Sequence, residues 1–393
     1  MVIVFLVSFA ACTVWSYLLF ARGRFWRTAE RDDRDAAPSP AHDRWPSVVA
    51  VVPARDEAAL IVETIGSLLR QHYPGPFSVA LVDDHSADGT AANARSAAQA
   101  AGAADRLTVL AGAPLPPGWS GKLWASEQGV RHADSLPEPP EYLLLTDADI
   151  THAPDMLSAL VTRARAGGLV LTSLMVKLRC ESVAERALIP AFVFFFQMLY
   201  PFRWVNRPNQ RTAAAAGGCM LVRRDALAAA GGIAAIRGAL IDDCALARRM
   251  KARGPIWLGL TERAHSLRPY PRVRDIRRMV ARTAYFQLRE SPLLLAATVL
   301  GMGVVYLAPP VLACLARGAA QILGLAAWAM MTVAYQPTLR FYRRSWVWGL
   351  ALPGIALAYL LFTLDSAWQH WRGRGGMWKG RTQAVSARSG KGL

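Results

Sequence analysis

Apolar stretches without a single charge, long enough to cross a lipid bilayer, stand at both ends of this 393-residue chain. They are residues 1–21, 291–316, 318–339 and 346–364. A helix of about 20 apolar residues spans the hydrocarbon core of a membrane. The sequence therefore predicts an N-terminal transmembrane anchor and a C-terminal transmembrane region over 291–364. Pro309 and Pro310 are expected to kink or end the helix that contains them.

The charges next to these stretches predict their orientation. No Lys or Arg precedes residues 1–21, whereas three Arg follow within 22–27. Because basic flanks stay on the cytoplasmic side, we expect the N-terminus outside and the following linker, 22–45, in the cytoplasm. Three C-terminal crossings would carry the basic tail 365–393 outside, so we expect one run not to cross fully. The sequence thus predicts a multi-pass membrane protein whose globular middle lies in the cytoplasm.

The overall charge points to an anionic partner, because 45 Lys and Arg against 28 Asp and Glu give a net charge of +17. Residues 263–289 hold eight Arg and one acid, and residues 371–393 hold six Lys or Arg and no acid. Both stretches flank apolar runs, so the expected partner is an anionic membrane surface. The chain has no zinc-finger spacing and no other nucleic-acid signature, which argues against nucleic acid. Its five Cys lack CxxC spacing, which argues against a disulfide framework or a structural zinc site.

The globular middle, about residues 46–285, alternates strand-like and helix-like segments. The expected strands are 47–53, 77–82, 107–110 and 142–146, and the expected helices are 57–71, 88–101 and 121–133. Such alternation is typical of βαβ units, so we predict an α/β fold with a mainly parallel sheet. The charge-free run 187–202 is short for a span. We interpret it as an interfacial amphipathic helix, with a buried core helix as the alternative.

Polar and acidic residues follow three of the expected strands, at the edge where parallel sheets bind ligands. They are Arg55, Asp56 and Glu57 after the first strand, Asp83 and Asp84 after the second, and Asp147 and Asp149 after the fourth. One such acid is explained by a helix cap or a turn, but three such ends in one βαβαβ unit favour a binding site. The pair Asp147 and Asp149 is suited to hold a divalent cation, Mg²⁺ or Mn²⁺, together with substrate phosphates.

Three further features each have a functional and a structural interpretation. Lys122, near an expected helix start, contacts a phosphate or is a solvated surface residue. Gly217 and Gly218 allow a backbone to approach a ligand closely or pack against a neighbouring strand. Asp242 and Asp243 open an expected helix, where one of them acts as a general base facing the metal or both only stabilise the helix dipole.

Six motifs follow one another along the chain. They are PARDE (53–57), VDDHSADGT (82–90), GK (121–122), TDAD (146–149), GGCMLVRRDAL (217–227) and DDCAL (242–246). This ordered set resembles the family 2 glycosyltransferases of the GT-A fold. With its membrane segments, the chain is similar to the ceramide-glucosyltransferase-like branch, and most of all to the hopanoid-biosynthesis-associated glycosyltransferases. The resemblance covers about residues 46–285.

The resemblance implies a role for each matched residue. The nucleotide-sugar site would be lined by Pro53, Arg55, Asp56, Glu57, Asp83 and Asp84. Lys122 would lie near the diphosphate, as would Asp147, which together with Asp149 would hold the metal. Asp243 would be the catalytic base, and Asp242 takes the place of the Glu that is common in the family.

The acceptor side departs from the pattern of polysaccharide synthases. Gly217 and Gly218 would lie beside the acceptor, but the QxxRW motif of processive synthases is absent, which argues against chain extension. Arg278 and Arg282 stand in the corresponding region and are candidates for diphosphate contacts. His265 is a candidate third metal ligand, with a structural role as the alternative.

The resemblance therefore implies a multi-pass enzyme of a bacterial-type inner (plasma) membrane, with its catalytic domain in the cytoplasm. It would be a glycosyltransferase of the hexosyltransferase type that moves a sugar, with inversion, from a UDP-sugar to a lipid hydroxyl in hopanoid or glycolipid biosynthesis, with Mg²⁺ or Mn²⁺ as cofactor. A polyprenyl phosphate acceptor is the first alternative. The second is a non-catalytic membrane scaffold or transport protein with a nucleotide-sugar-binding domain, against which the intact carboxylates and the charge-free terminal runs argue. A nucleotidyltransferase fits the DDCAL segment poorly.

Overall fold

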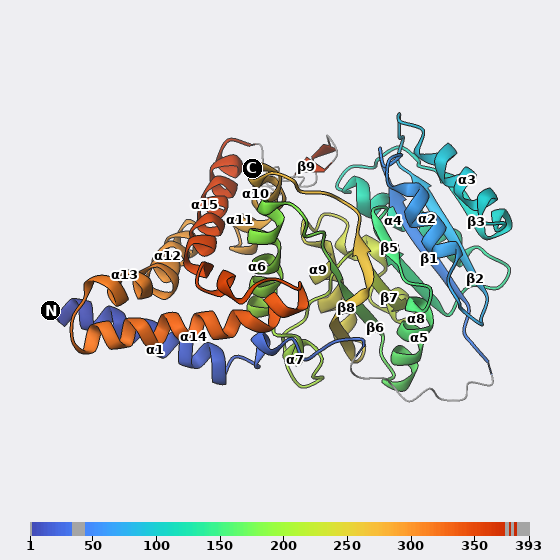
Figure 1. Cartoon of the computed structure of the whole chain (residues 1–393). Coiled ribbons are helices and arrows are strands. Elements are labelled where there is room, and N and C mark those ends of the chain that lie inside the picture. The colour runs from blue at the N-terminus through green and yellow to red at the C-terminus, as the bar shows by residue number, and fades with distance from the viewer. Residues whose placement is uncertain (1, 34–43, 374–376, 379–380, 383–393) are drawn as a thin grey trace, which may run out of the picture. The chain divides into compact units, whose positions relative to one another are not determined.

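The computed structural model describes residues 2–33, 44–373, 377–378 and 381–382. The chain divides into two compact units, each built from separate stretches of sequence, and Figure 1 labels their elements. The described parts of the helical unit are 2–29, 179–203 and 269–373, and those of the sheet unit are mainly 30–33, 44–178 and 204–268. The expected catalytic domain 46–285 thus contains two stretches, 179–203 and 269–285, that group with the helical unit. Parts of the expected linker 22–45 and tail 365–393 lie outside the described residues.

An eight-stranded sheet runs through the sheet unit in the order β3-β2-β1-β4-β7-β6-β8-β5. The strands are β1 (Val48–Ala54), β2 (Phe77–Asp83), β3 (Leu107–Ala111), β4 (Tyr142–Thr146), β5 (Ile150–His152), β6 (Leu171–Lys177), β7 (Cys219–Arg223) and β8 (Ile256–Ser266). Strands β3, β2, β1 and β4 are parallel to one another, which confirms the predicted α/β fold. Strand β7 runs antiparallel to β4 and β6, and β5 runs antiparallel to β8. The second half of the sheet is therefore mixed.

Helices connect these strands. The three helices predicted between the first four strands are all present with slightly different ends, and the helix expected to open at Asp242 is also present. The helices in the sheet unit and at its borders are α2 (Ile61–Leu69), α3 (Thr90–Ala100), α4 (Gly121–Asp134), α5 (Met156–Ala166), α7 (Phe202–Val205), α8 (Arg224–Ala229) and α9 (Asp242–Lys251). In α2, the helical period puts Ile61, Ile65 and Leu68 on one face, and all three are fully buried in the core that includes β1. Strands β1 and β4 are buried along their whole length, which is why their sequences are continuous apolar runs.

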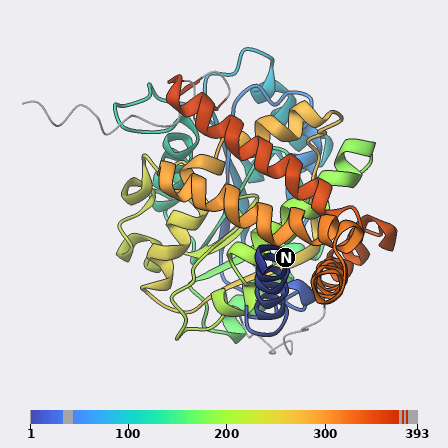
Figure 2. The same cartoon turned by 90° about the vertical axis from the view of Figure 1, so that its left-hand side faces the viewer.

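The helical unit consists mostly of apolar helices. They are α1 (Val2–Phe20), α6 (Val183–Leu199), α10 (Val273–Ala281), α11 (Ala284–Gln287), α12 (Pro292–Met302), α13 (Ala308–Leu315), α14 (Ala319–Phe341) and α15 (Leu352–Trp371). Helix α1 packs along α14, and the two lie side by side in Figures 1 and 2. Trp15 Nε1 of α1 also donates to the backbone oxygen of Val305 at 2.8 Å. A π-helical turn, Gly303–Leu307, separates α12 from α13 just before Pro309 and Pro310, so the helix is interrupted where the sequence predicts.

Four helical stretches of the described chain are long and apolar enough to cross a membrane. They are Val2–Phe20, Val183–Val205, Pro292–Leu315 and Ala319–Phe341. The expected run 346–364 is divided instead between a 3₁₀ turn, Trp346–Gly349, and helix α15. The run 187–202 lies mainly in α6, where Ile189 and Val193 are fully buried. This burial is what the alternative interpretation, a helix packed inside the protein, predicts.

Candidate active site

The loops that follow β1 and β2 hold each other through backbone and side-chain hydrogen bonds. Asp56 has a φ of +50°, an uncommon value for a residue other than glycine. Its N–H donates to Ser86 Oγ at 2.9 Å, and its Oδ1 accepts the N–H of Ala87 at 2.9 Å. The N–H of Glu57 donates to Thr90 Oγ1, also at 2.9 Å. The carboxylate of Asp56 therefore shapes these two loops, at the edge of the sheet where nucleotide contacts are expected.

Asp84, the expected nucleotide-contacting acid, lies just after β2 and is only 2% exposed. Arg55 Nη1 donates to the backbone oxygen of Asp84 at 2.6 Å and lies 3.6 Å from its Oδ2. The preceding Asp83 accepts the N–H of Ser86 at 3.1 Å. The structure thus brings Arg55, Asp83 and Asp84 together, and Arg55 binds the backbone oxygen of Asp84 and forms an ion pair with its carboxylate.

Lys122 joins two parts of the sequence that the motifs place far apart. It stands in the first turn of α4, which Ser120 caps by accepting the N–H of Leu123 at 3.3 Å. Its Nζ lies 2.8 Å from Asp147 Oδ1 and 3.3 Å from Asp242 Oδ2, and the side chain is 20% exposed. Burial opposes the ammonium charge, but the two carboxylates outweigh it and raise the pKa of Lys122. Lys122 is therefore a fixed cation between the acid that follows β4 and the acids that open α9.

Asp243 has the electrostatic properties of a general base. Its Oδ2 accepts the N–H of Gly217 at 3.0 Å. Burial and the neighbouring charge of Asp242 raise its pKa to about 6, while Lys122 and the N–H groups of Cys244 and Gly217 act in the opposite direction. A carboxyl group with a pKa near the working pH both accepts and releases protons efficiently. The helix start predicted from the sequence thus carries a carboxylate suited to proton transfer.

The two glycines before β7 have different surroundings. A Cβ on Gly217 would lie 3.5 Å from Lys122 Nζ and 3.6 Å from Asp243 Oδ2, so Gly217 faces the cluster of charged side chains. A Cβ on Gly218 would lie 2.8 Å from Val176 Cγ2. Gly218 also accepts the hydroxyl of Thr146 at 2.7 Å through its backbone oxygen. The functional interpretation fits Gly217, and the packing interpretation fits Gly218.

Asp149 is held by an arginine whose role the sequence does not reveal. Arg268 Nε donates to Asp149 Oδ2 at 2.7 Å, and its Nη2 donates to Glu57 Oε1 at 2.5 Å. The pairing of β5 with β8, continued by the N–H of Leu267 donating to Asp149 O at 2.8 Å, brings Arg268 beside Asp149. The sequence assigns Arg268 only to a basic stretch facing the membrane. Its two carboxylate partners correct that interpretation.

Several of these side chains line one pocket of the sheet unit, including Pro53, Lys122, Asp147, Gly217, Ile236 and Asp242. The polar and glycine members are predicted from the sequence. Ile236 and Ile233, which also line the pocket, are not. Apolar residues after a glycine pair carry no local signal that separates a pocket wall from a core.

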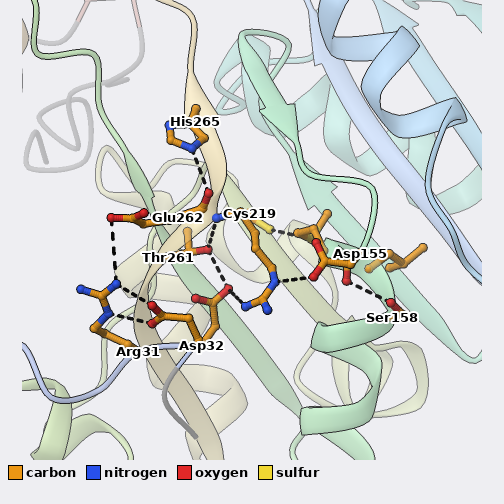
Figure 3. A network of polar contacts seen from close by, with 12 residues as sticks. Arg31, Asp32, Asp155, Ser158, Cys219, Thr261, Glu262 and His265 are labelled. Atoms are coloured by element: carbon orange, nitrogen blue, oxygen red, sulfur yellow. Dashed lines mark hydrogen bonds and ion pairs between the residues drawn. The ribbon is translucent and has the colours of Figure 1, made fainter. Parts of the chain in front are cut away.

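The remaining expected site residues are His265, Arg278 and Arg282. His265 is exposed, and its Nε2 lies 2.9 Å from the backbone oxygen of Glu262 on its own strand (Figure 3), so it fits the structural alternative. Arg278 lies in α10 and Arg282 directly follows it, and both belong to the helical unit. Arg263, counted in the basic stretch, is paired with acids of the sheet unit, as Arg268 is.

The carboxylates after β4 suit a divalent cation, although each is held by a protein cation in this structure. Lys122 contacts Oδ1 of Asp147, and Arg268 contacts Oδ2 of Asp149. Partial burial and the nearby Asp149 and Asp242 raise the pKa of Asp147, against the effect of Lys122. Among the described residues, no three His, Cys, Asp or Glu side chains come together as a ready metal site. Mg²⁺ or Mn²⁺ would thus take its remaining ligands from phosphates and water, which is a common arrangement for Mg²⁺.

Comparison with known proteins gives a family and a fold. Residues 49–231 match the family model described as Glycosyl transferase family 2. No curated protein sequence matches the chain. The mannosyltransferase PcManGT from Pyrobaculum calidifontis, solved in complex with GDP-Man and Mn²⁺, is similar in fold, with a TM-score of 0.52 and 19% identity over 93% of this chain and 99% of that chain.

Two other solved structures align with lower scores. A TarS fragment from S. aureus in complex with UDP-GlcNAc gives a TM-score of 0.39 and 12% identity, over 85% of this chain and 95% of that chain. A glucosyl-3-phosphoglycerate synthase from Mycobacterium tuberculosis in complex with Mn²⁺, UDP-glucose and glycerol 3-phosphate gives 0.36 and 21%, over 57% of this chain and 73% of that chain. Neither score is high enough to define a shared fold. The family match over residues 49–231, on a GT-A-like sheet, shows that this chain carries a glycosyltransferase family 2 domain and is a glycosyltransferase.

Proposed function

We propose that this glycosyltransferase is a membrane-bound, inverting enzyme that moves a sugar from a UDP-sugar to the hydroxyl of a lipid, in hopanoid or another glycolipid biosynthesis. One observation carries the proposal. Lys122 Nζ contacts both Asp147, at 2.8 Å, and Asp242, at 3.3 Å. These contacts support a single site for the expected diphosphate end of the donor and the expected base, Asp243, which follows Asp242.

The residues divide the proposed reaction between them. Asp243 accepts the proton of the acceptor hydroxyl as its oxygen attacks the anomeric carbon, and the bond from that carbon to the diphosphate oxygen breaks. A metal held by Asp147 and Asp149 would supply charge neutralisation for the departing diphosphate. Lys122 adds a cation at the same place. The ends of β1 and β2, with Arg55 holding Asp84, provide the nucleotide side.

A lipid acceptor is supported by the apolar helices. Four helical stretches of the described chain are long and apolar enough to cross a membrane, so the enzyme would work where hydrophobic acceptors reside. PcManGT was solved with GDP-Man, and for that reason GDP-mannose is a donor worth testing beside UDP-sugars. A UDP-sugar remains our proposal because Asp84 matches the uracil-contacting acid of the family that the sequence resembles.

The test uses membranes that contain wild-type protein, Asp243→Asn or the control Asp225→Asn. Asp225 also lies in the first turn of a helix, α8, but its side chain is 67% exposed and pairs with Arg223. Each membrane is incubated with Mg²⁺ or Mn²⁺, radiolabelled UDP-sugars or GDP-mannose, and hopanoid, sterol or ceramide. The readout is label in the organic extract and its stability to mild acid.

We expect an acid-stable lipid product that Asp243→Asn reduces by about 10²–10⁴-fold, the usual contribution of a general base. Asp225→Asn should leave the product unchanged, and UDP binding should survive both substitutions. An acid-labile product that persists in Asp243→Asn would replace the lipid hydroxyl with a polyprenyl phosphate. Full activity of Asp243→Asn with an acid-stable product would overturn the assignment of the base.

A further inference from the structure

Arg268 connects two segments of the active-site edge that are far apart in sequence. Its Nε holds Asp149 Oδ2 at 2.7 Å, and its Nη2 holds Glu57 Oε1 at 2.5 Å. Asp149 is the second acid of the expected metal pair, and Glu57 belongs to the loop after β1. One guanidinium group therefore forms hydrogen bonds both with an expected metal ligand, Asp149, and with a residue of the expected nucleotide site, Glu57.

The two carboxylates depend on this guanidinium group because they are largely removed from water. The side chains of Glu57 and Asp149 are 10% and 13% exposed, and that of Arg268 is 31% exposed. Arg268 therefore gives each of these two acids a charge-assisted hydrogen bond that water supplies only poorly there. Without Arg268, the two carboxylates would turn towards solvent or other donors, since an unpaired buried charge is costly. Such a turn would displace Asp149 as a metal ligand.

The geometry also leaves one oxygen of Asp149 for another ligand. Arg268 takes Oδ2, and no described residue forms a hydrogen bond with Oδ1. A carboxylate fixed through one oxygen presents its other oxygen in a defined direction. Outer partners of this kind orient metal ligands, and their removal typically lowers metal affinity by about 10–100-fold.

We propose that Arg268 is the positioning residue of the metal site: it holds Asp149 oriented to bind the divalent cation, with Glu57 as its second anchor. This inference rests on the proposed metal-dependent function. It gives Glu57 a role through Arg268 rather than in direct contact with the nucleotide. Lys cannot replace Arg268 fully, because the planar guanidinium reaches two carboxylates with two different nitrogens.

A nearby arginine offers a matched control. Arg263 lies on β8, five residues before Arg268; it donates from Nε to Asp155 Oδ2 at 2.8 Å and has Nη1 3.3 Å from Asp32 Oδ2. Figure 3 shows this second network, in which Arg31, Asp32, Thr261 and Glu262 take part. Arg263 thus also pairs with two acids, through one hydrogen bond and one ion pair, but neither acid is an expected metal ligand.

The experiment measures Mn²⁺ binding to the full chain in detergent, by electron paramagnetic resonance of free Mn²⁺, with and without UDP. Metal-free UDP binding is measured separately by calorimetry. The variants are Arg268→Ala, Arg268→Lys, Glu57→Gln and Arg263→Ala. Glu57→Gln leaves both Arg268 and Asp149 in place and keeps the test informative if Arg268→Ala does not fold.

We expect Arg268→Ala to weaken Mn²⁺ binding in the presence of UDP by about 10–100-fold, with metal-free UDP binding retained. Arg268→Lys should restore part of the affinity, and Glu57→Gln should weaken it less than Arg268→Ala does. Arg263→Ala should lower the melting temperature without changing Mn²⁺ affinity. Wild-type Mn²⁺ affinity in a folded Arg268→Ala or, failing that, in Glu57→Gln would overturn the inference, as would an equal loss in Arg263→Ala. If wild-type protein itself shows no Mn²⁺-dependent UDP binding, the proposed function fails, and this inference fails with it.

Discussion

At the scale of single residues, the candidate site is organised by cations that stand between carboxylates. Lys122 lies between Asp147 and Asp242, and Arg268 lies between Asp149 and Glu57. Each cation offsets the repulsion between the two carboxylates that it contacts. The arrangement concentrates negative oxygens where a metal and a diphosphate are expected, without leaving a buried charge unpaired.

Asp243 leads to a prediction in which activity and stability change in opposite directions. Its pKa is raised from 3.8 to about 6 in the folded protein, so the folded state binds this proton more tightly than the unfolded state does. The resulting stabilisation is complete below about pH 4 and is lost as the pH rises through about 6. Activity needs the ionised carboxylate and should rise over the upper part of this range.

Asp243→Asn should therefore lose activity and raise the melting temperature at pH 8, while the melting temperatures of the two proteins converge at pH 4. Thermal unfolding of both proteins in detergent at pH 4, 6 and 8 measures this difference. A variant that melts below the wild type at pH 8 would show that the charge of Asp243 stabilises the fold, contrary to the prediction.

A site residue could be predicted from the sequence when its role depends on residues close to it in the chain. Asp147 and Asp149 follow an apolar strand, and Asp242 and Asp243 open a helix, so short patterns were enough to single them out. The role of Arg268 was not predictable, because its partner Asp149 is 119 residues away and reaches it only through the pairing of β5 with β8. Charge alone placed Arg268 at a membrane surface.

At the scale of elements, the parallel half of the sheet followed from the sequence and the mixed half did not. Strands β1 and β4 are buried on both faces, so they read as continuous apolar runs separated by helical patterns. Strand β7 enters between β4 and β6 in antiparallel orientation. No local pattern encodes that orientation, because it depends on which neighbours the strand meets.

The segment that leads into β7 predicts different results for two adjacent alanine substitutions. In Gly218→Ala, the new Cβ would lie 2.8 Å from Val176 Cγ2, and such overpacking costs about 1–3 kcal/mol of unfolding free energy. In Gly217→Ala, the Cβ would make ordinary contacts at 3.5 Å and 3.6 Å with Lys122 and Asp243. That methyl group should leave stability nearly unchanged and lower turnover, since it covers the base.

Melting temperatures and initial rates of the two glycine variants, measured in the same detergent, check this prediction. Equal loss of stability in both variants would contradict it. So would normal turnover of Gly217→Ala.

At the scale of the whole molecule, the apolar helices predict how the protein sits in a membrane. The run 346–364 is not among the four stretches suited to cross, which agrees with the expectation that one C-terminal run does not cross fully. With Val183–Val205 packed inside the protein, as the burial of Ile189 and Val193 favours, the two C-terminal crossings Pro292–Leu315 and Ala319–Phe341 would return the chain to the cytoplasm. The basic tail would then lie on the side that the positive-inside rule favours.

We expect the full chain to remain in the membrane pellet after an alkaline carbonate wash. A variant lacking residues 2–21 should remain there too, because the later apolar helices are still present. Green fluorescent protein fused to the C-terminus should fluoresce, and alkaline phosphatase fused there should be inactive. Release of the full chain into the supernatant, or an active phosphatase fusion, would contradict this topology.

The alternation of the two units along the chain has a consequence for how the protein is made. The ribosome delivers α1 first, then β1 to β6, then α6, and only afterwards β7 and β8. Because β7 stands between β4 and β6 in the sheet, the sheet cannot close until a further apolar helix has left the ribosome. If the apolar helices enter a membrane as we propose, folding of the sheet and membrane insertion are interleaved in time. Any single continuous fragment that contains the whole sheet unit therefore also contains α6.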